Sequence, residues 1–184
     1  LDDGNFFTDI DCRPNVDSYD PNDKQAFTSG WSDEHFLEPN IDIEYLIRFQ
    51  NEGTDTAFRV VVLDTLPQEL DITTFHEMSY SFPYQLEINT LVSGRHELRY
   101  TFTDINLLPK SVDEAASTGF LRYTINQQAD LPIGTTIQNR AGIYFDFNPP
   151  VMTEYAFHTI GINFIDVINT VQTIGNQPLD IQIM

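Results

Sequence analysis

The chain is poor in cysteine, in basic residues and in long apolar runs, and each shortage excludes a class of protein. Cys12 is the only cysteine in 184 residues, so neither an intrachain disulfide nor a cysteine metal cluster can form. Nine Lys and Arg residues against 28 Asp and Glu give a net charge of -19, which repels phosphates and excludes nucleic acid as a partner. No apolar stretch reaches the roughly 18 residues of a transmembrane helix, so we expect a protein that does not span a membrane.

The sequence motifs of common enzymes are missing as well. The chain has no Gly-x-Ser-x-Gly elbow, no glycine-rich phosphate loop and no His-Glu-x-x-His zinc motif. Its four histidines do not form a pair at short helical spacing, which argues against zinc. We therefore expect no catalytic residues and a protein that is not an enzyme.

The residues that are present favour β-strands throughout. In Asp42–Gln50, Ile43, Tyr45, Ile47 and Phe49 alternate with more polar residues, as in a half-buried strand. Val112–Ser117 is the best helical candidate, and it is so short that it indicates a loop with one turn. Further strands are expected at Ala57–Leu63, Tyr84–Leu91, Glu97–Thr103, Phe120–Asn126, Thr136–Phe145 and Val151–Thr159. This pattern predicts an all-β fold, an immunoglobulin-like antiparallel β-sandwich of about seven to nine strands.

Composition divides the chain into three parts. Residues 1–40, rich in Asp, Asn, Pro and Gly, are expected to be an irregular acidic lead-in packed on the sandwich, and residues 41–160 its core. Residues 161–184 have few charges and are expected to form a C-terminal strand or a linker toward a further domain.

Five sequence motifs follow one another along the chain. They are SYDPNDK (18–24), DIEYLIRFQNEGTDTA (42–57), LDTLP (63–67), DLPIGT (130–135) and NRAGIYFDFN (139–148). With these motifs in this order, the chain resembles the conserved-repeat domain of unknown function found near the C-terminus of large surface or secreted proteins of Bacteroidota, just before a type IX secretion sorting domain. The resemblance implies an immunoglobulin-like spacer or stalk module outside the cell, next to other domains of the same chain, with no established activity.

One candidate site is a covalent crosslink between a lysine and an asparagine. Lys24 and Lys110 are the only lysines, and Lys24 lies in the first motif. A lysine buried in an apolar pocket beside a carboxyl can attack an asparagine amide and release ammonia. The asparagine would be Asn148 or Asn139, and the carboxyl Asp64 or Glu44. The alternative is an ordinary salt bridge of Lys24 with Asp20, Asp23 or another acid.

A second candidate is a calcium site in the acidic lead-in. Calcium binds six to eight oxygen ligands, and Asp and Asn are frequent in this segment. The EF-hand spacing is absent, and the alternative is that these residues only form turns. The candidate ligands are Asp17, Asp20, Asn22, Asp23 and Asp146.

A third candidate is an exposed aromatic surface for glycans. Trp31 lies in the irregular lead-in, where we expect it to be exposed, whereas aromatic residues in strands usually belong to the core. The sequence thus favours a secreted or cell-surface structural module, with an adhesive or carbohydrate-binding module as the alternative. A glycan or a cell-surface protein would then be the partner.

Overall fold

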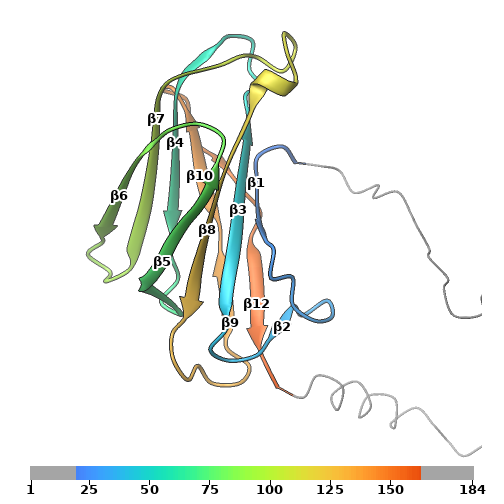
Figure 1. Ribbon diagram of the computed structural model, residues 1–184, viewed down its shortest axis with the longest axis vertical. Coiled ribbons are helices and arrows are strands. Elements are labelled where there is room, and N and C mark those ends of the chain that lie inside the picture. Colours follow the sequence, from blue (N-terminus) through green and yellow to red (C-terminus); the bar gives the residue numbers. More distant parts are fainter. Residues whose placement is uncertain (1–19, 163–184) are drawn as a thin grey trace, which may run out of the picture.

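A computed structural model describes residues 20–162, which form strands and one short 3-10 helix, Ala115–Ser117. In Figure 1 the long strands run roughly along the vertical axis, side by side. The twelve strands of the described residues belong to three sheets. The all-β sandwich expected from the sequence is confirmed, and its strand number exceeds the expected seven to nine because four strands have only two to four residues.

The first sheet has the strand order β1-β3-β8-β5, and all its pairs are antiparallel. β3 and β8 pair along their whole length, with Tyr45 opposite Tyr123 and Ile47 opposite Leu121. One face of this pair is therefore continuously apolar and turns inward. The bounds are β1 (Asp23–Ala26), β3 (Asp42–Gln50), β8 (Thr118–Gln127) and β5 (Leu70–Tyr80).

The second sheet has the order β11-β10-β4-β7-β6 and packs against the first. In β4, Val60, Val62 and Asp64 share the inward face because side chains alternate along a strand. An acidic residue thus occupies a core position. The bounds are β11 (Val151–Met152), β10 (Ala141–Phe145), β4 (Ala57–Thr65), β7 (His96–Leu107) and β6 (Gln85–Thr90).

A small third sheet, β2-β12-β9, closes the side of the sandwich near β1. β12 pairs antiparallel with β9 and parallel with β2. Only Arg140 separates β9 from β10, although the two strands belong to different sheets. Asn139 is thereby held at the junction. The bounds are β2 (Phe36–Leu37), β12 (Ala156–Ile160) and β9 (Thr136–Asn139).

The core between the two larger sheets consists of large aliphatic and aromatic side chains. Each fully buried side chain of this kind stabilises the fold by about 2 kcal/mol relative to an exposed one. Gly119 lies opposite Phe49, and a Cβ at Gly119 would lie 2.3 Å from carbons of the Phe49 ring. Core side chains with zero exposure include Ile43, Tyr45, Ile47, Phe49, Val60, Val62, Leu98, Tyr100, Phe102, Leu121, Tyr123 and Ile125.

The structure differs from the expected strands in three ways. No strand was expected at β5, because its register shifts break the alternation of apolar residues. The expected strands 136–145 and 151–159 are each divided in two, at Arg140 and at residues 153–155. The lead-in contributes two short strands, β1 and β2, whose backbone hydrogen bonds extend the first and third sheets. The single turn expected within Val112–Ser117 is present as the 3-10 helix.

Candidate functional site

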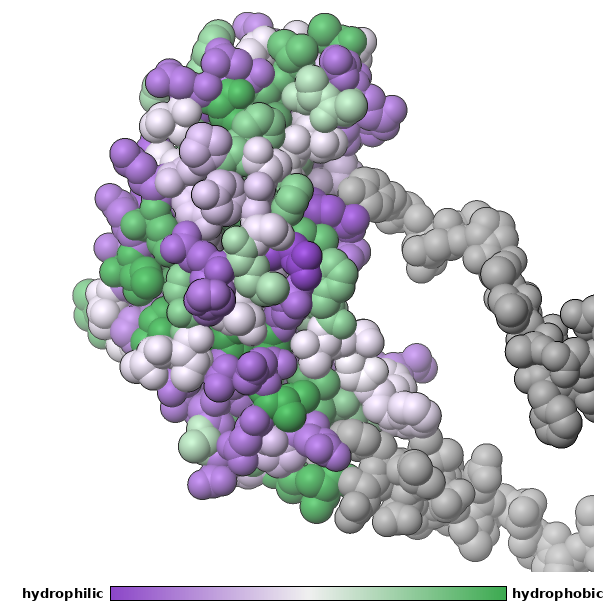
Figure 2. All heavy atoms as spheres, in the orientation of Figure 1, coloured by the Kyte–Doolittle hydropathy of each residue, from purple (hydrophilic) through white to green (hydrophobic). Residues whose placement is uncertain are grey.

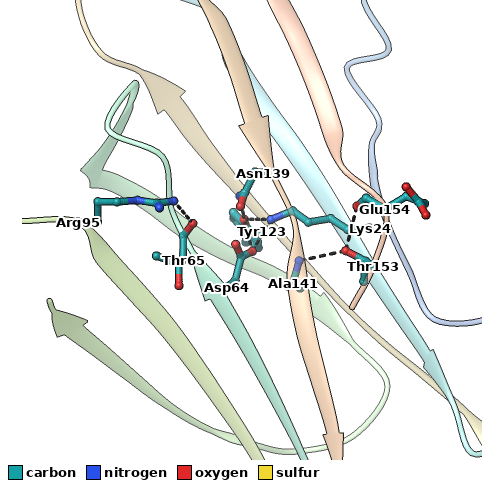
Figure 3. A network of polar contacts seen from close by, with 9 residues as sticks. All are labelled: Lys24, Asp64, Thr65, Arg95, Tyr123, Asn139, Ala141, Thr153 and Glu154. Carbon is teal, nitrogen blue, oxygen red and sulfur yellow. Dashed lines mark hydrogen bonds and ion pairs between the residues drawn. The ribbon is translucent and has the colours of Figure 1, made fainter. Parts of the chain in front are cut away.

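Four polar side chains from four strands meet in the interior of the sandwich (Figure 3). Lys24 comes from β1, Asp64 from β4, Tyr123 from β8 and Asn139 from β9. All four are almost completely buried, with the side chains of Lys24 and Asp64 at 0% exposure. The site thus draws on all three sheets, and it is complete only when the sheets have assembled.

Lys24 and Asp64 form a buried ion pair between Nζ and Oδ2. Lys24 Nζ also donates a hydrogen bond of 2.8 Å to the Tyr123 hydroxyl, which in turn donates to Asp64 Oδ2 at 2.6 Å. Asn139 Nδ2 donates to the same hydroxyl at 3.3 Å. One oxygen atom therefore contacts the amine, the carboxylate and the carboxamide.

Aromatic rings surround the lysine amine. Lys24 Nζ lies 4.3 Å from the centroid of the Tyr45 ring and 5.3 Å from that of Tyr123. Burial lowers the pKa of Lys24 from 10.5 to about 8, because the loss of hydration outweighs the attraction of Asp64. A larger fraction of Lys24 is therefore neutral, and nucleophilic, than for a lysine in water.

Two oxygen atoms of the site have no hydrogen-bond partner within the described residues, Asp64 Oδ1 and Asn139 Oδ1. A buried acceptor without a donor is costly, and a protonated carboxyl supplies one O–H donor. Asp64 Oδ1 and Asn139 Oδ1 are thus the two acceptors of the site that the Lys24–Asp64–Tyr123 contacts leave unused.

Buried tyrosines complete the surroundings of Asp64. Burial, followed by the negative charge of Asp64, raises the pKa of Tyr45, Tyr100 and Tyr123 above the ordinary value. These hydroxyls therefore stay neutral, and they can donate and accept hydrogen bonds without carrying charge.

The end of β4 is fixed directly beyond Asp64. Arg95 Nη2 donates to the carbonyl oxygen of Thr65 at 2.8 Å, and its Nε donates to that of Leu66 at 2.9 Å. On the opposite side, the amide of Ala141 donates to Thr153 Oγ1 at 3.0 Å and anchors the start of β10 just after Asn139. These contacts hold Asp64 and Asn139 in place from outside the site.

The structure separates the crosslink candidates named from the sequence. Lys24, Asp64 and Asn139 come together, whereas Asn148 is exposed in the turn between β10 and β11. Glu44 points to the outer face of the first sheet and pairs with Arg122. Sequence reasoning missed Tyr123, because its place in an alternating strand resembles that of any core tyrosine.

The calcium candidates lie in two places. Asp20 Oδ1 accepts from the Asn22 amide at 2.9 Å, and Asp23 forms an ion pair with Arg48 beside β1. Asp146 Oδ1 accepts from the amides of Phe58 and Arg59 at 3.0 and 2.8 Å, where β4 shifts register. Asp17 lies outside the described residues. No cluster of three or more His, Cys, Asp or Glu residues suited to a metal ion occurs within residues 20–162.

Exposed aromatic residues flank β1. Trp31 is 51% exposed, as expected, and it bridges to Phe36 through two backbone hydrogen bonds. Phe27 is 55% exposed, and the guanidinium of Arg122 lies 4.6 Å from its ring centroid. Tyr80 is similarly exposed, but it lies at the end of β5, on the opposite edge of the first sheet from β1. On the face drawn in Figure 2, hydrophobic and hydrophilic side chains are interspersed in small groups.

The sheets and their shared core define a β-sandwich domain. The chain belongs to the family described as a domain of unknown function, DUF7619, whose model matches residues 20–159. No curated protein matches the chain. Among the described residues, no helix has the length and apolar character needed to cross a membrane.

Solved structures with a similar fold include domains of bacterial surface proteins. The N-terminal domain of a Streptococcus gordonii adhesin has a TM-score of 0.50 at 10% identity, covering 77% of this chain and 33% of that one. A C-terminal fragment of the major pilin of Streptococcus agalactiae has a TM-score of 0.45 at 12% identity, covering 76% and 55%. The collagen-binding domain of a Staphylococcus aureus adhesin has a TM-score of 0.41 at 11% identity, covering 78% and 98%. This chain thus spans about a third to a half of the first two structures.

Proposed function

We propose that the domain is a non-catalytic structural or stalk module of a larger secreted or surface-anchored protein, and that an isopeptide bond between Lys24 and Asn139 locks its fold. The observation that carries the proposal is the buried convergence of Lys24, Asp64 and Asn139 on one hydroxyl. These are the amine, the acid and the amide that such a bond requires. An ion pair alone would leave the Oδ1 atom of the buried Asn139 without a hydrogen-bond partner.

The bond would form by a balanced exchange of one amide for another. Lys24 first passes a proton to Asp64, and the neutral amine attacks Cγ of Asn139 while Asp64 protonates Oδ1. The Nζ–Cγ bond forms, one proton moves from Nζ to Nδ2, and the Cγ–Nδ2 bond breaks to release ammonia. The adduct hydroxyl then returns its proton to Asp64, which ends as a neutral carboxylic acid holding the proton that it took from the Lys24 ammonium. Fixed positions of the three groups in a dry core would accelerate the attack.

A bond of this kind would stabilise the fold as a disulfide does. It would close a loop from residue 24 to residue 139 and restrict the unfolded chain, worth about 4–5 kcal/mol for a loop of this size. A chain with a single cysteine has no disulfide of its own to supply that stabilisation. The crosslink also needs no oxidant.

Intact mass spectrometry tests the proposal. The folded chain should be lighter than its sequence by one ammonia, and Lys24→Ala, Asp64→Ala and Asn139→Ala should each restore the sequence mass. Asn148→Ala is the matched control, because an exposed asparagine should leave the ammonia loss intact. A wild-type mass equal to that of the sequence would show that Lys24 is only ion-paired.

The biological setting proposed here rests on the five-motif resemblance. It supports an extracellular or cell-surface location, in Bacteroidota, next to other domains of the same chain and before a type IX secretion sorting domain. The strong negative charge is compatible with a saline exterior. Detection of the parent protein in the culture supernatant or on the cell surface, and its loss when type IX secretion is disabled, would test this location.

The exposed Trp31 favours a second function, an adhesive or carbohydrate-binding module. Sugars stack on exposed aromatic rings, and Phe27, four residues earlier in the chain, is 55% exposed as well. A glycan array should show binding that Trp31→Ala removes and that Val112→Ala, an exposed apolar control, does not. Equal signals from the wild type and Trp31→Ala would reject this function.

A bound calcium ion is another way to tie β1 to the sandwich in this proposal. Asp20, Asn22 and Asp23 supply oxygen atoms next to β1, and Asp146 would have to be joined to them. Removal of calcium by a chelator would lower the melting temperature if these oxygens bind the ion. An unchanged melting temperature would mean that they only form turns and ion pairs.

A further inference from the structure

The Tyr123 hydroxyl uses every hydrogen-bonding position it has. A phenolic oxygen donates one hydrogen bond and accepts two. Here it donates to Asp64 and accepts from Lys24 Nζ at 2.8 Å and from Asn139 Nδ2 at 3.3 Å. The attacking nitrogen and the leaving nitrogen of the proposed reaction therefore contact the same oxygen atom.

We infer that Tyr123 is a catalytic residue of the crosslinking reaction, relaying the proton from the attacking amine to the departing amide nitrogen. This inference rests on the proposed Lys24–Asn139 bond. The reaction requires such a proton transfer. After the attack, Nζ is positively charged and must lose a proton, whereas Nδ2 must receive one before it can leave as ammonia. No solvent is needed, because both nitrogens lie in the buried core.

The step balances without any further reagent. The adduct Nζ gives one proton to the Tyr123 oxygen as the Tyr123 hydroxyl gives its own proton to Nδ2. The Cγ–Nδ2 bond then breaks, the electron pair leaves with ammonia, and the hydroxyl is restored. Asp64 meanwhile exchanges its proton with the carbonyl oxygen of Asn139, so the two proton transfers use different groups.

Two surface pockets border the site. One, of about 380 Å³, borders Asn139 and is lined in part by Arg95, Gly142 and Met152. A second pocket, of about 250 Å³, borders Lys24 on the side of β12. Asn139 and Lys24 thus each line a pocket at the surface of the domain.

The test compares two tyrosines that differ in their contacts. The starting material is protein from inclusion bodies that is dissolved in denaturant and has its full sequence mass. Removal of the denaturant starts folding, and the loss of ammonia is followed by intact mass spectrometry. Tyr123→Phe should slow the loss about 100-fold, the usual scale for one acid–base group. Tyr80→Phe is the control, since this tyrosine is 52% exposed at the end of β5 and lies outside the site. It should react within about twofold of the wild-type rate, since no acid–base group is lost.

Each outcome decides a different point. A wild type that never loses ammonia would overturn the crosslink and the relay together. A wild type that reacts, with Tyr123→Phe equally fast, would overturn the relay alone. If Tyr123→Phe does not refold, 3,5-difluorotyrosine at position 123 keeps the hydroxyl and makes it more acidic. The relay then predicts a changed rate of ammonia loss, because the group that accepts one proton and donates another has changed its acidity, and an unchanged rate rejects it.

Discussion

At the scale of single residues, the unusual feature is an amine held in a core of aromatic rings. Burial favours the neutral form of Lys24, and the Tyr45 and Tyr123 rings partly compensate for the lost water when it is charged. The sequence alone identified Lys24 as one of two lysines, but it left two asparagines and two carboxyls open. Strand alternation favours Asp64, which shares a face with Val60 and Val62. Asn139 could be selected only from the structure. It lies where the chain passes from the third sheet, through β9, to the second sheet, through β10, and the sequence pattern does not reveal this change of sheet.

The first prediction concerns the pH dependence of the uncrosslinked fold. In Asn139→Ala, Lys24 cannot react, and the folded state releases its proton near pH 8, whereas the unfolded chain keeps it up to the ordinary pKa of 10.5. Unfolding therefore takes up a proton between these values, so the free energy of unfolding should rise with pH across this window. The rise from this group is at most about 3 kcal/mol.

Urea unfolding of Asn139→Ala from about pH 7 to about pH 10 measures this slope. The double variant Lys24→Met, Asn139→Ala is the control, and it should lack the contribution while keeping that of the other titrating groups. Identical slopes for the two variants would contradict a lowered pKa at Lys24.

At the scale of elements, β3 and β8 form the part of the fold that was easiest to predict. Their alternation is regular, and their pairing brings like faces together. β5 was not predictable, because an edge strand with two register shifts shows no simple period. β1 is short, and beside the partly buried Ala26 its one fully buried side chain is Lys24, so the strand's chief contribution to the interior is this amine.

The second prediction tests the close approach of β3 and β8. Gly119→Ala should destabilise the fold by about 1–3 kcal/mol, because the new methyl group would overlap the buried ring of Phe49. Gly142→Ala is the matched control. Its nearest neighbour is the flexible Met152 Sδ at 3.2 Å from the added Cβ, which can move aside. Chemical denaturation of both variants measures the difference, and equal losses would contradict the contact with Phe49.

At the scale of the whole molecule, the proposed bond decides how tension would pass through the domain. Lys24 lies near the beginning of the sandwich and Asn139 near its end, so the bond would join β1 directly to β9. Tension between the two ends of the described chain would pass through the bond. The strands between residues 24 and 139 would carry none of it.

The third prediction follows from this path. In single-molecule stretching, the wild type should lengthen only by the residues outside the crosslinked loop. Asn139→Ala should release the loop and add roughly 400 Å of contour length, given the reach of an extended chain. Asn148→Ala should behave as the wild type. Equal extensions for the wild type and Asn139→Ala would mean that no bond bears the load.

The convergence of three sheets on one site has a consequence for biogenesis. Lys24, Asp64 and Asn139 meet only in a correctly assembled sandwich. The proposed condensation releases ammonia into the solvent, so the reaction would be irreversible in practice. A chain with a misplaced first strand would keep its amine and its amide indefinitely. The loss of one ammonia from a molecule would then show that this molecule had once reached its native fold. Because the bond is covalent, the loss could still be measured after the protein is denatured by heat or digested into peptides.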